Sequence, residues 1–254
     1  MMDAWRAALA AIGLVLGLGH AASAAEGVAV PSRSWAFEGI VGTYDRAAAQ
    51  RGFQVYQAVC AGCHGVRFLA FRNLLDIGLD EETVRAVAAE HTVMDGPDDA
   101  GEMFERPGRL SDRWPSPFAN EQAARAAMGG AYPVDLSLIT KARPQGPDYL
   151  SALLTGYHEP PADMEVPDGL YYNAYFPGHL IAMPPPLSDG AVDYADGTEA
   201  TVAQMASDVT YFLMWLAEPK LEERKQTGVK VVLFLIVLTA LLFAYKRRVW
   251  ADVH

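Results

Sequence analysis

Apolar residues recur with helical spacing in four stretches of the chain, at residues 44–60, 80–91, 121–128 and 198–216. Phe53, Val55 and Tyr56 gather on one face of the first stretch, and the last carries an apolar stripe from Val202 to Leu216. The second stretch begins with three acidic residues, which suit the positive end of a helix dipole. The pattern therefore predicts four amphipathic helices.

Turn-forming residues dominate two long segments between these helices, residues 95–117 and 158–186. Together they hold most of the 16 prolines, and neither shows the alternation of apolar and polar residues that is typical of a strand. We therefore expect a mainly α fold with long loop insertions.

The first 24 residues have the pattern of a secretory signal peptide. Arg6 precedes an apolar run over residues 7–18, and small residues follow at Ala22-Ser23-Ala24. About a dozen apolar residues are too few to cross a bilayer. We therefore expect the leader to be removed and the rest of the chain to be exported.

Residues 228–245 form an apolar stretch whose single charge, Lys230, lies near its start. The stretch is long enough to cross the hydrocarbon core, and it lacks the polar face of a core helix. The basic run Lys246-Arg247-Arg248 follows, and such runs stay on the cytoplasmic side. The sequence thus predicts a signal peptide (1–24), a periplasmic domain (25–227), one C-terminal transmembrane helix (228–245) and a cytoplasmic tail (246–254).

Residues 25–227 are acidic, with 29 acidic and 15 basic residues and a net charge of −14. The acidic residues concentrate around residues 95–105, 159–168 and 189–199. This balance disfavours a nucleic-acid partner, because phosphates bind to basic surfaces. Two interpretations remain open: the charge attracts basic proteins, or it keeps the domain soluble.

The two cysteines stand in the motif Cys60-Ala61-Gly62-Cys63-His64. Two thiols at this spacing on a helical turn add across the vinyl groups of a haem, and the adjoining histidine then reaches the iron. A thioredoxin-like redox pair would follow a strand in a βαβ pattern, and a zinc site would need two further ligands at familiar spacing. Neither context is present, so we expect one covalent haem c with His64 as an iron ligand.

A haem that transfers electrons usually has a sixth ligand, and a methionine thioether raises its potential relative to a second histidine. Met183 is preferred, because the prolines at 184–186 fix an extended backbone that holds the sulfur in one position. The alternatives are Met128 and Met164, and the rival histidines are His91, His158 and His179.

Several stretches beyond the haem motif resemble the cytochrome c1 family in its bacterial form, the haem-bearing subunits of ubiquinol-cytochrome c oxidoreductase (the cytochrome bc1 complex). They are Gly52-Phe53-Gln54-Val55-Tyr56, Asp95-Gly96-Pro97-Asp98-Asp99, Arg106-Pro107-Gly108-Arg109, Asp135-Leu136-Ser137, Leu153-Leu154-Thr155-Gly156-Tyr157 and Tyr175-Phe176-Pro177-Gly178. The order of leader, acidic outer domain and C-terminal anchor is also similar to that family.

The resemblance implies a c-type cytochrome domain with long loop insertions and one C-terminal transmembrane helix in a bacterial inner membrane. It implies Met183 as the sixth iron ligand and Arg143 as the partner of a haem propionate, because an arginine fork suits a carboxylate. It also implies that Pro133, Tyr149 and Phe176 line the pocket.

The implied function is one-electron transfer from a Rieske iron-sulfur protein to a soluble c-type cytochrome, in a complex that also holds cytochrome b. Quinol oxidation then takes place on another subunit, and the acidic domain favours a basic cytochrome as acceptor. Two alternatives stay open: another membrane-anchored monohaem cytochrome, either an oxidase subunit or a free shuttle, and a thiol-disulfide oxidoreductase.

Overall fold

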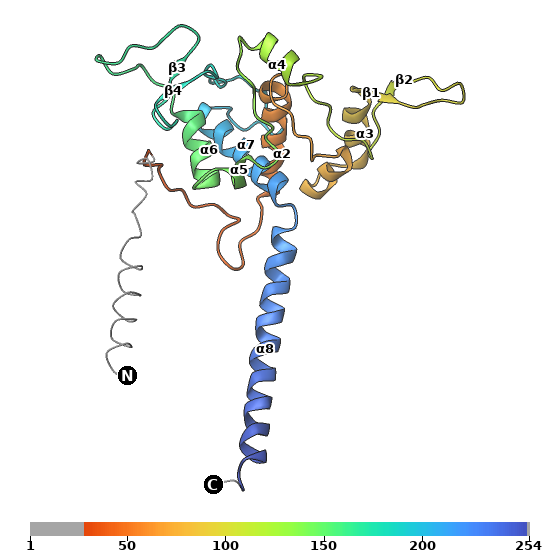
Figure 1. The fold of residues 1–254 in the computed structure, drawn as a ribbon, viewed down its shortest axis with the longest axis vertical. Helices are drawn as coiled ribbons and strands as arrows, with labels where there is room; N and C mark the ends of the chain where they lie inside the picture. Colours follow the sequence, from red (N-terminus) through yellow and green to blue (C-terminus); the bar gives the residue numbers. More distant parts are fainter. Residues whose placement is uncertain (1–27, 253–254) are drawn as a thin grey trace, which may run out of the picture.

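A mainly helical head sits on one long helix, α8 (Leu221–Val249), in the computed structural model, which describes residues 28–252 (Figure 1). The predicted signal peptide lies outside the described residues. The head contains α2 (Arg46–Val55), η1 (Tyr56–Cys60), η2 (Phe71–Ile77), α3 (Glu81–Ala89), α4 (Glu121–Ala127), α5 (Ile139–Ala142), α6 (Gly146–Thr155) and α7 (Val202–Ala217). The prediction of a mainly α fold with long loops is confirmed.

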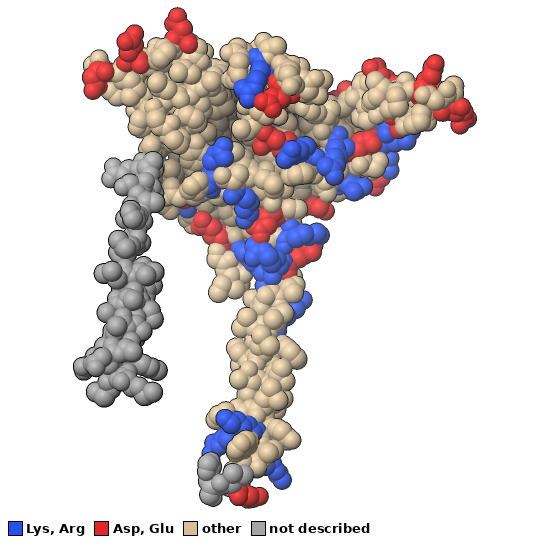
Figure 2. All heavy atoms as spheres, in the orientation of Figure 1, with Lys and Arg blue, Asp and Glu red and all other residues tan. Residues whose placement is uncertain are grey.

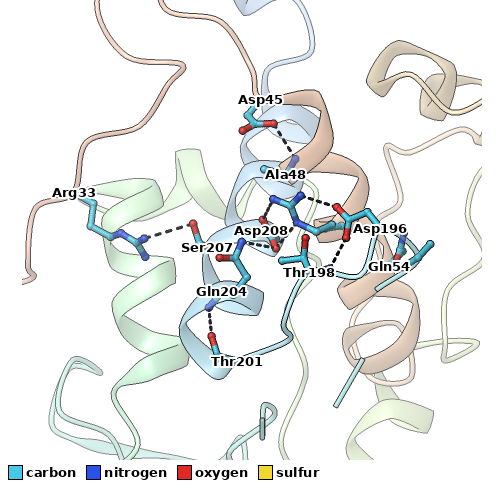
Figure 3. Close-up of polar contacts among 12 residues, drawn as sticks. Arg33, Asp45, Ala48, Gln54, Asp196, Thr198, Thr201, Gln204, Ser207 and Asp208 are labelled. Atoms are coloured by element: carbon cyan, nitrogen blue, oxygen red, sulfur yellow. Dashed lines mark hydrogen bonds and ion pairs between the residues drawn. The ribbon is translucent and has the colours of Figure 1, made fainter. Parts of the chain in front are cut away.

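All four predicted helices form, and each begins at a side chain that accepts a hydrogen bond from the first turn. The caps are Asp45 for α2, Asp80 for α3, Asn120 for α4 and Thr201 for α7. The caps of α2 and α7 are visible in Figure 3. Because Thr201 caps α7, this helix begins at Val202, a few residues after the start of the predicted stretch 198–216.

Four short strands form in or beside residues 95–117 and 158–186, which show no alternating pattern in the sequence. Strand β1 (Thr92–Asp95) pairs antiparallel with β2 (Phe104–Pro107), and β3 (Tyr171–Tyr172) pairs antiparallel with β4 (Leu180–Ile181). The two-residue strands are too short for an alternating pattern, and neither four-residue strand alternates apolar with polar residues along its sequence. Side-chain contacts stabilise the first hairpin instead, because Arg106 pairs with Asp95 and Asp112.

The core lies where α2 crosses α7, and the crossing depends on a glycine. A Cβ at Gly52 would lie 2.0 Å from the carbonyl oxygen of Asp208, so only glycine allows the two backbones to approach this closely. Beside it, the Phe53 ring meets Trp114 edge-on at 5.7 Å and Phe212 at 5.6 Å. This packing fixes the helix that leads directly into η1 and the cysteine motif.

A buried ion pair joins the same two helices. The Arg51 guanidinium donates two hydrogen bonds of 3.0 Å to Asp208, whose side chain is 1% exposed, and a third of 3.0 Å to Asp196. Gln204 also donates to Asp208, as Figure 3 shows. Arg51 therefore connects α2, α7 and the loop that precedes α7.

Helix α8 is the one helix in residues 28–252 that is long and apolar enough to cross a membrane, because an 18-residue window within it has a mean hydropathy of 2.4. It begins at Leu221, before the predicted span, because its first turns pack on the head. Leu221 is buried, and Glu222 accepts a hydrogen bond from the backbone of Tyr44 and pairs with Arg46. Figure 2 shows the apolar part of α8 between charged groups at both ends.

Candidate haem site

The cysteine motif forms one helical turn at the end of η1. The backbone N–H groups of Cys63 and His64 both donate to the carbonyl of Cys60, at 3.2 and 2.9 Å. Both thiols are free and half-buried. The turn thus brings together the two thiols and the imidazole that the sequence singled out.

The electrostatics of the Cys60 thiol differ from those of a redox-active nucleophile. Burial, and to a smaller extent Cys63, raises the pKa of the Cys60 thiol to about 12. A thiol-disulfide oxidoreductase needs the opposite shift, because the thiolate is its nucleophile. Within residues 28–252, no three His, Cys, Asp or Glu side chains gather as a metal site.

The imidazole of His64 is held in the form that binds a metal. Its Nδ1 lies 2.7 Å from the carbonyl oxygen of Val134; because a carbonyl only accepts, Nδ1 carries the proton and Nε2 keeps its lone pair. Burial lowers the pKa of His64, which favours the neutral ring. The hydroxyl of the buried Tyr56 donates to the His64 carbonyl at 2.9 Å and fixes the backbone.

Met183 follows β4 and is half-buried. Its carbonyl accepts a hydrogen bond of 3.1 Å from the hydroxyl of Tyr157, just after α6. Burial raises the pKa of both Tyr157 and Tyr149; Tyr149 lies close enough to add to the shift of Tyr157, and the Arg143 guanidinium close enough to oppose that of Tyr149. Arg143 therefore lies near Tyr149, Tyr149 lies near Tyr157, and Tyr157 contacts Met183.

Pro133 and Phe176 lie at two other places in the head. Pro133 precedes Val134, whose carbonyl orients His64. Phe176 lies in the turn between β3 and β4, where its N–H donates to the side chain of Asn173 at 3.2 Å. The fully buried Asn173 in turn donates to the Leu153 carbonyl and ties this turn to α6. In the described part of the chain, no hydrogen bond joins His64 or Val134 to Met183 or Tyr157.

The rival ligands occupy different positions. The His91 ring packs 4.5 Å from Trp114 in the aromatic core, and the His179 ring stacks on Tyr172 with Nδ1 facing the Asn173 carbonyl. Met128 caps the end of α4, and His158 and Met164 lie in the long loop after α6.

Three positioning residues were missed by the sequence analysis: Tyr56, Tyr157 and Asn173. Both tyrosines stand in stretches that resemble the cytochrome c1 family, and that was the available signal. Asn173 carries no signal, because a polar residue within a turn-rich segment predicts exposure rather than complete burial.

A helical domain whose Cys-x-x-Cys-His turn presents a neutral, oriented histidine defines a c-type cytochrome. The donor set fits a covalent haem, because two free thiols and a metal-binding nitrogen share one turn. A profile of the Cytochrome C1 family matches residues 35–253, and the chain belongs to this family. It is therefore a haem-carrying electron-transfer subunit with one covalent haem c.

Relatives cover nearly the whole chain. Cytochrome c1 of Rhodospirillum rubrum is 49% identical over 263 residues, covering 97% of both proteins. Cytochrome c1-2, heme protein, mitochondrial, of Solanum tuberosum is 54% identical and covers 92% of this chain and 91% of its own. Cytochrome b/c1 of Bradyrhizobium diazoefficiens is 53% identical over 88% of this chain, which spans 36% of that longer protein.

Proposed function

We propose that this chain is the haem subunit of a cytochrome bc1 complex and passes single electrons from a Rieske iron-sulfur protein to a soluble c-type cytochrome. The observation that carries the proposal is the family match over residues 35–253, which includes both the cysteine motif and α8. When bound, the haem supplies an iron that takes up and releases one electron.

The chain's own residues would hold and tune this group. Cys60 and Cys63 form the thioether bonds, and His64 binds the iron through Nε2, which its contact with Val134 leaves free. Met183 is the sixth ligand, supported by the bond from Tyr157 to its carbonyl and by the prolines that follow it. Among the described residues, no hydrogen bond joins Tyr149 or Tyr157 to Met128 or Met164.

Arg143 is the partner of a haem propionate in this proposal. It is exposed at the end of α5, where its guanidinium donates to the carbonyl of Ala142 and lies beside the Tyr149 side chain. Its guanidinium is therefore available to a carboxylate. Pro133, Tyr149 and Phe176 complete the pocket in this proposal.

The membrane orientation follows from the charges at the ends of α8. Lys246, Arg247 and Arg248 form its last turn, and basic residues favour the cytoplasmic side. Together with a leader at residues 1–24, these charges support a head in the periplasm of a bacterial cell and a C-terminus in the cytoplasm.

The acceptor is a basic cytochrome in this proposal. Acidic side chains gather at the projecting end of the β1–β2 hairpin and along the loop beside β3 and β4 (Figure 2). Asp95 and Asp196 are paired with Arg106 and Arg51, so the steering field comes from their exposed neighbours. Such a field speeds encounter more than it tightens binding.

Purification of the tagged full chain from mild detergent tests the proposal. We expect a haem-staining band on a denaturing gel, together with a Rieske protein and the spectrum of b-type haem. A c-type spectrum without b-type haem or partner subunits would favour the free shuttle. A band without haem would contradict the cytochrome assignment itself.

A further inference from the structure

The two most exposed large hydrophobic side chains in the described residues are Ile40 and Val41, with 75% and 87% of their surface accessible. They are adjacent at the tip of the loop formed by residues 37–43, before α2. Even the apolar residues of α8 that face outward are less exposed, with Phe234 at 64%. Two apolar residues in such a position call for a partner surface.

Backbone contacts and buried aromatic rings hold this loop in a defined conformation. The Thr43 N–H donates to the Ala36 carbonyl at 3.0 Å and closes its base. Gly42 permits the tight return, because a Cβ there would lie 1.8 Å from the Glu38 carbonyl oxygen. The flanking rings of Trp35 and Phe37 are buried and stacked at 5.5 Å. The tip is therefore held in place while its side chains stay in solvent.

The first turns of α8 fix the direction of the loop. The Lys225 ammonium donates to the carbonyl of Phe37 at 2.5 Å and to that of Gly42 at 3.2 Å, and so it holds both ends of the loop. Lys225 is one helical turn before Val229, where the outward-facing apolar surface of α8 begins. Figure 1 shows the loop extending from the head alongside the start of α8.

We propose that this loop is a second membrane contact, in which Ile40 and Val41 enter the interfacial region of the bilayer beside α8. The proposal rests on α8 crossing the membrane, which belongs to the proposed function. A lipid surface is the occupant because the tip is next to the level where α8 enters the hydrocarbon, and because Ile and Val gain by leaving water there. Two contacts would also restrict the tilt of the head relative to α8.

Spin labels on the full-length holoprotein in nanodiscs test this directly. Cys60 and Cys63 are consumed by the haem, so a cysteine at position 40 or 41 is the single free thiol. The variants are Ile40→Cys and Val41→Cys, with Val231→Cys on α8 as the lipid reference and Ala100→Cys at the exposed hairpin tip as the aqueous reference. Collisions of the nitroxide with oxygen and with a water-soluble nickel chelate report its depth.

We expect labels at 40 and 41 to collide several-fold less with the nickel chelate than the label at 100 does, and more with oxygen, as at 231. Nickel collisions equal to those at 100 would overturn the proposal. If labels at 40 and 41 are protected from both oxygen and the nickel chelate, and only in the purified complex, the loop contacts a neighbouring subunit. That result would also overturn the proposal. An aqueous profile at 231 would instead show that α8 is not the anchor, which is a failure of the proposed function.

Discussion

The hydroxyl of Tyr157 donates a hydrogen bond to the main-chain carbonyl of Met183 over 3.1 Å. The two residues are 26 positions apart, and the bond joins the end of α6 to the segment that follows β4. If Met183 is the sixth ligand, this bond restrains the backbone that presents its sulfur.

Tyr157→Phe removes only this bond, and we expect it to loosen Met183 by about 1 kcal/mol, roughly fivefold in the equilibrium between held and released loop. The near-infrared Met-to-iron band should then disappear at a lower denaturant concentration than in the parent protein. Tyr171→Phe, at an exposed tyrosine of β3, is the matched control and should leave the midpoint unchanged. Equal midpoints for both variants would show that Tyr157 does not support the ligand.

Met183→Leu should keep the covalent haem, because Cys60 and Cys63 are untouched. We expect the redox potential to fall by on the order of a few hundred millivolts, within the range that axial ligands set. Redox titration measures the change, with Met164→Leu and Met128→Leu as controls that should keep the parent potential. A parent-like potential in Met183→Leu, with a fall in one of the controls, would move the ligand to that methionine.

Asp208→Asn should destabilise the head far more than the loss of a surface ion pair. Asp208 is 1% exposed and accepts two hydrogen bonds from Arg51, and breaking a buried pair from one side costs about 3 kcal/mol or more. Glu81→Gln removes the exposed pair with Arg85 and should cost less than about 0.5 kcal/mol. Urea unfolding compares the two variants, and equal losses would mean that Arg51 is held adequately by Asp196 alone.

Two truncations should distinguish the role of the first turns of α8, which pack on the head, from that of its apolar part. A chain that stops after Thr227 keeps Leu221, Glu222 and Lys225, so it should be released as a soluble haem protein. A chain that stops after Lys220 loses the buried Leu221 side chain and should be less stable by about 2 kcal/mol. Fractionation and thermal unfolding test this. Recovery of the longer form in washed membranes from cells that lack partner subunits would reveal another anchor.

Local patterns were sufficient for much of the fold and for the covalent part of the site. Helices α2, α3, α4 and α7 have both an apolar stripe and a capping side chain, and the cysteine motif is contiguous in the sequence. Helix α6 was missed because Gly146-Pro147 at its start and Gly156 at its end are typical of turns.

The remaining contacts depend on residues far apart in the chain. Arg51 and Asp208 are 157 positions apart, and His64 and Val134 are 70 apart. Neither pair leaves a local pattern, because a basic residue on an amphipathic helix predicts a solvated face until the partner helix is placed. The prolines after Met183 and the resemblance to a family together favoured Met183, the resemblance alone supplied Arg143, and Asn173 needed the structure.

Stopped-flow spectroscopy of the purified complex can follow electrons into and out of the haem of this chain. After mixing with quinol, the c-type α-band of this chain should rise, and a basic cytochrome c should then reoxidise it. Reoxidation should slow steeply as salt is raised, because the Debye length is about 8 Å at physiological ionic strength, while reduction inside the complex should change little. A c-type haem that stays oxidised while the b-type haems are reduced, in a complex that retains its Rieske subunit, would contradict the account.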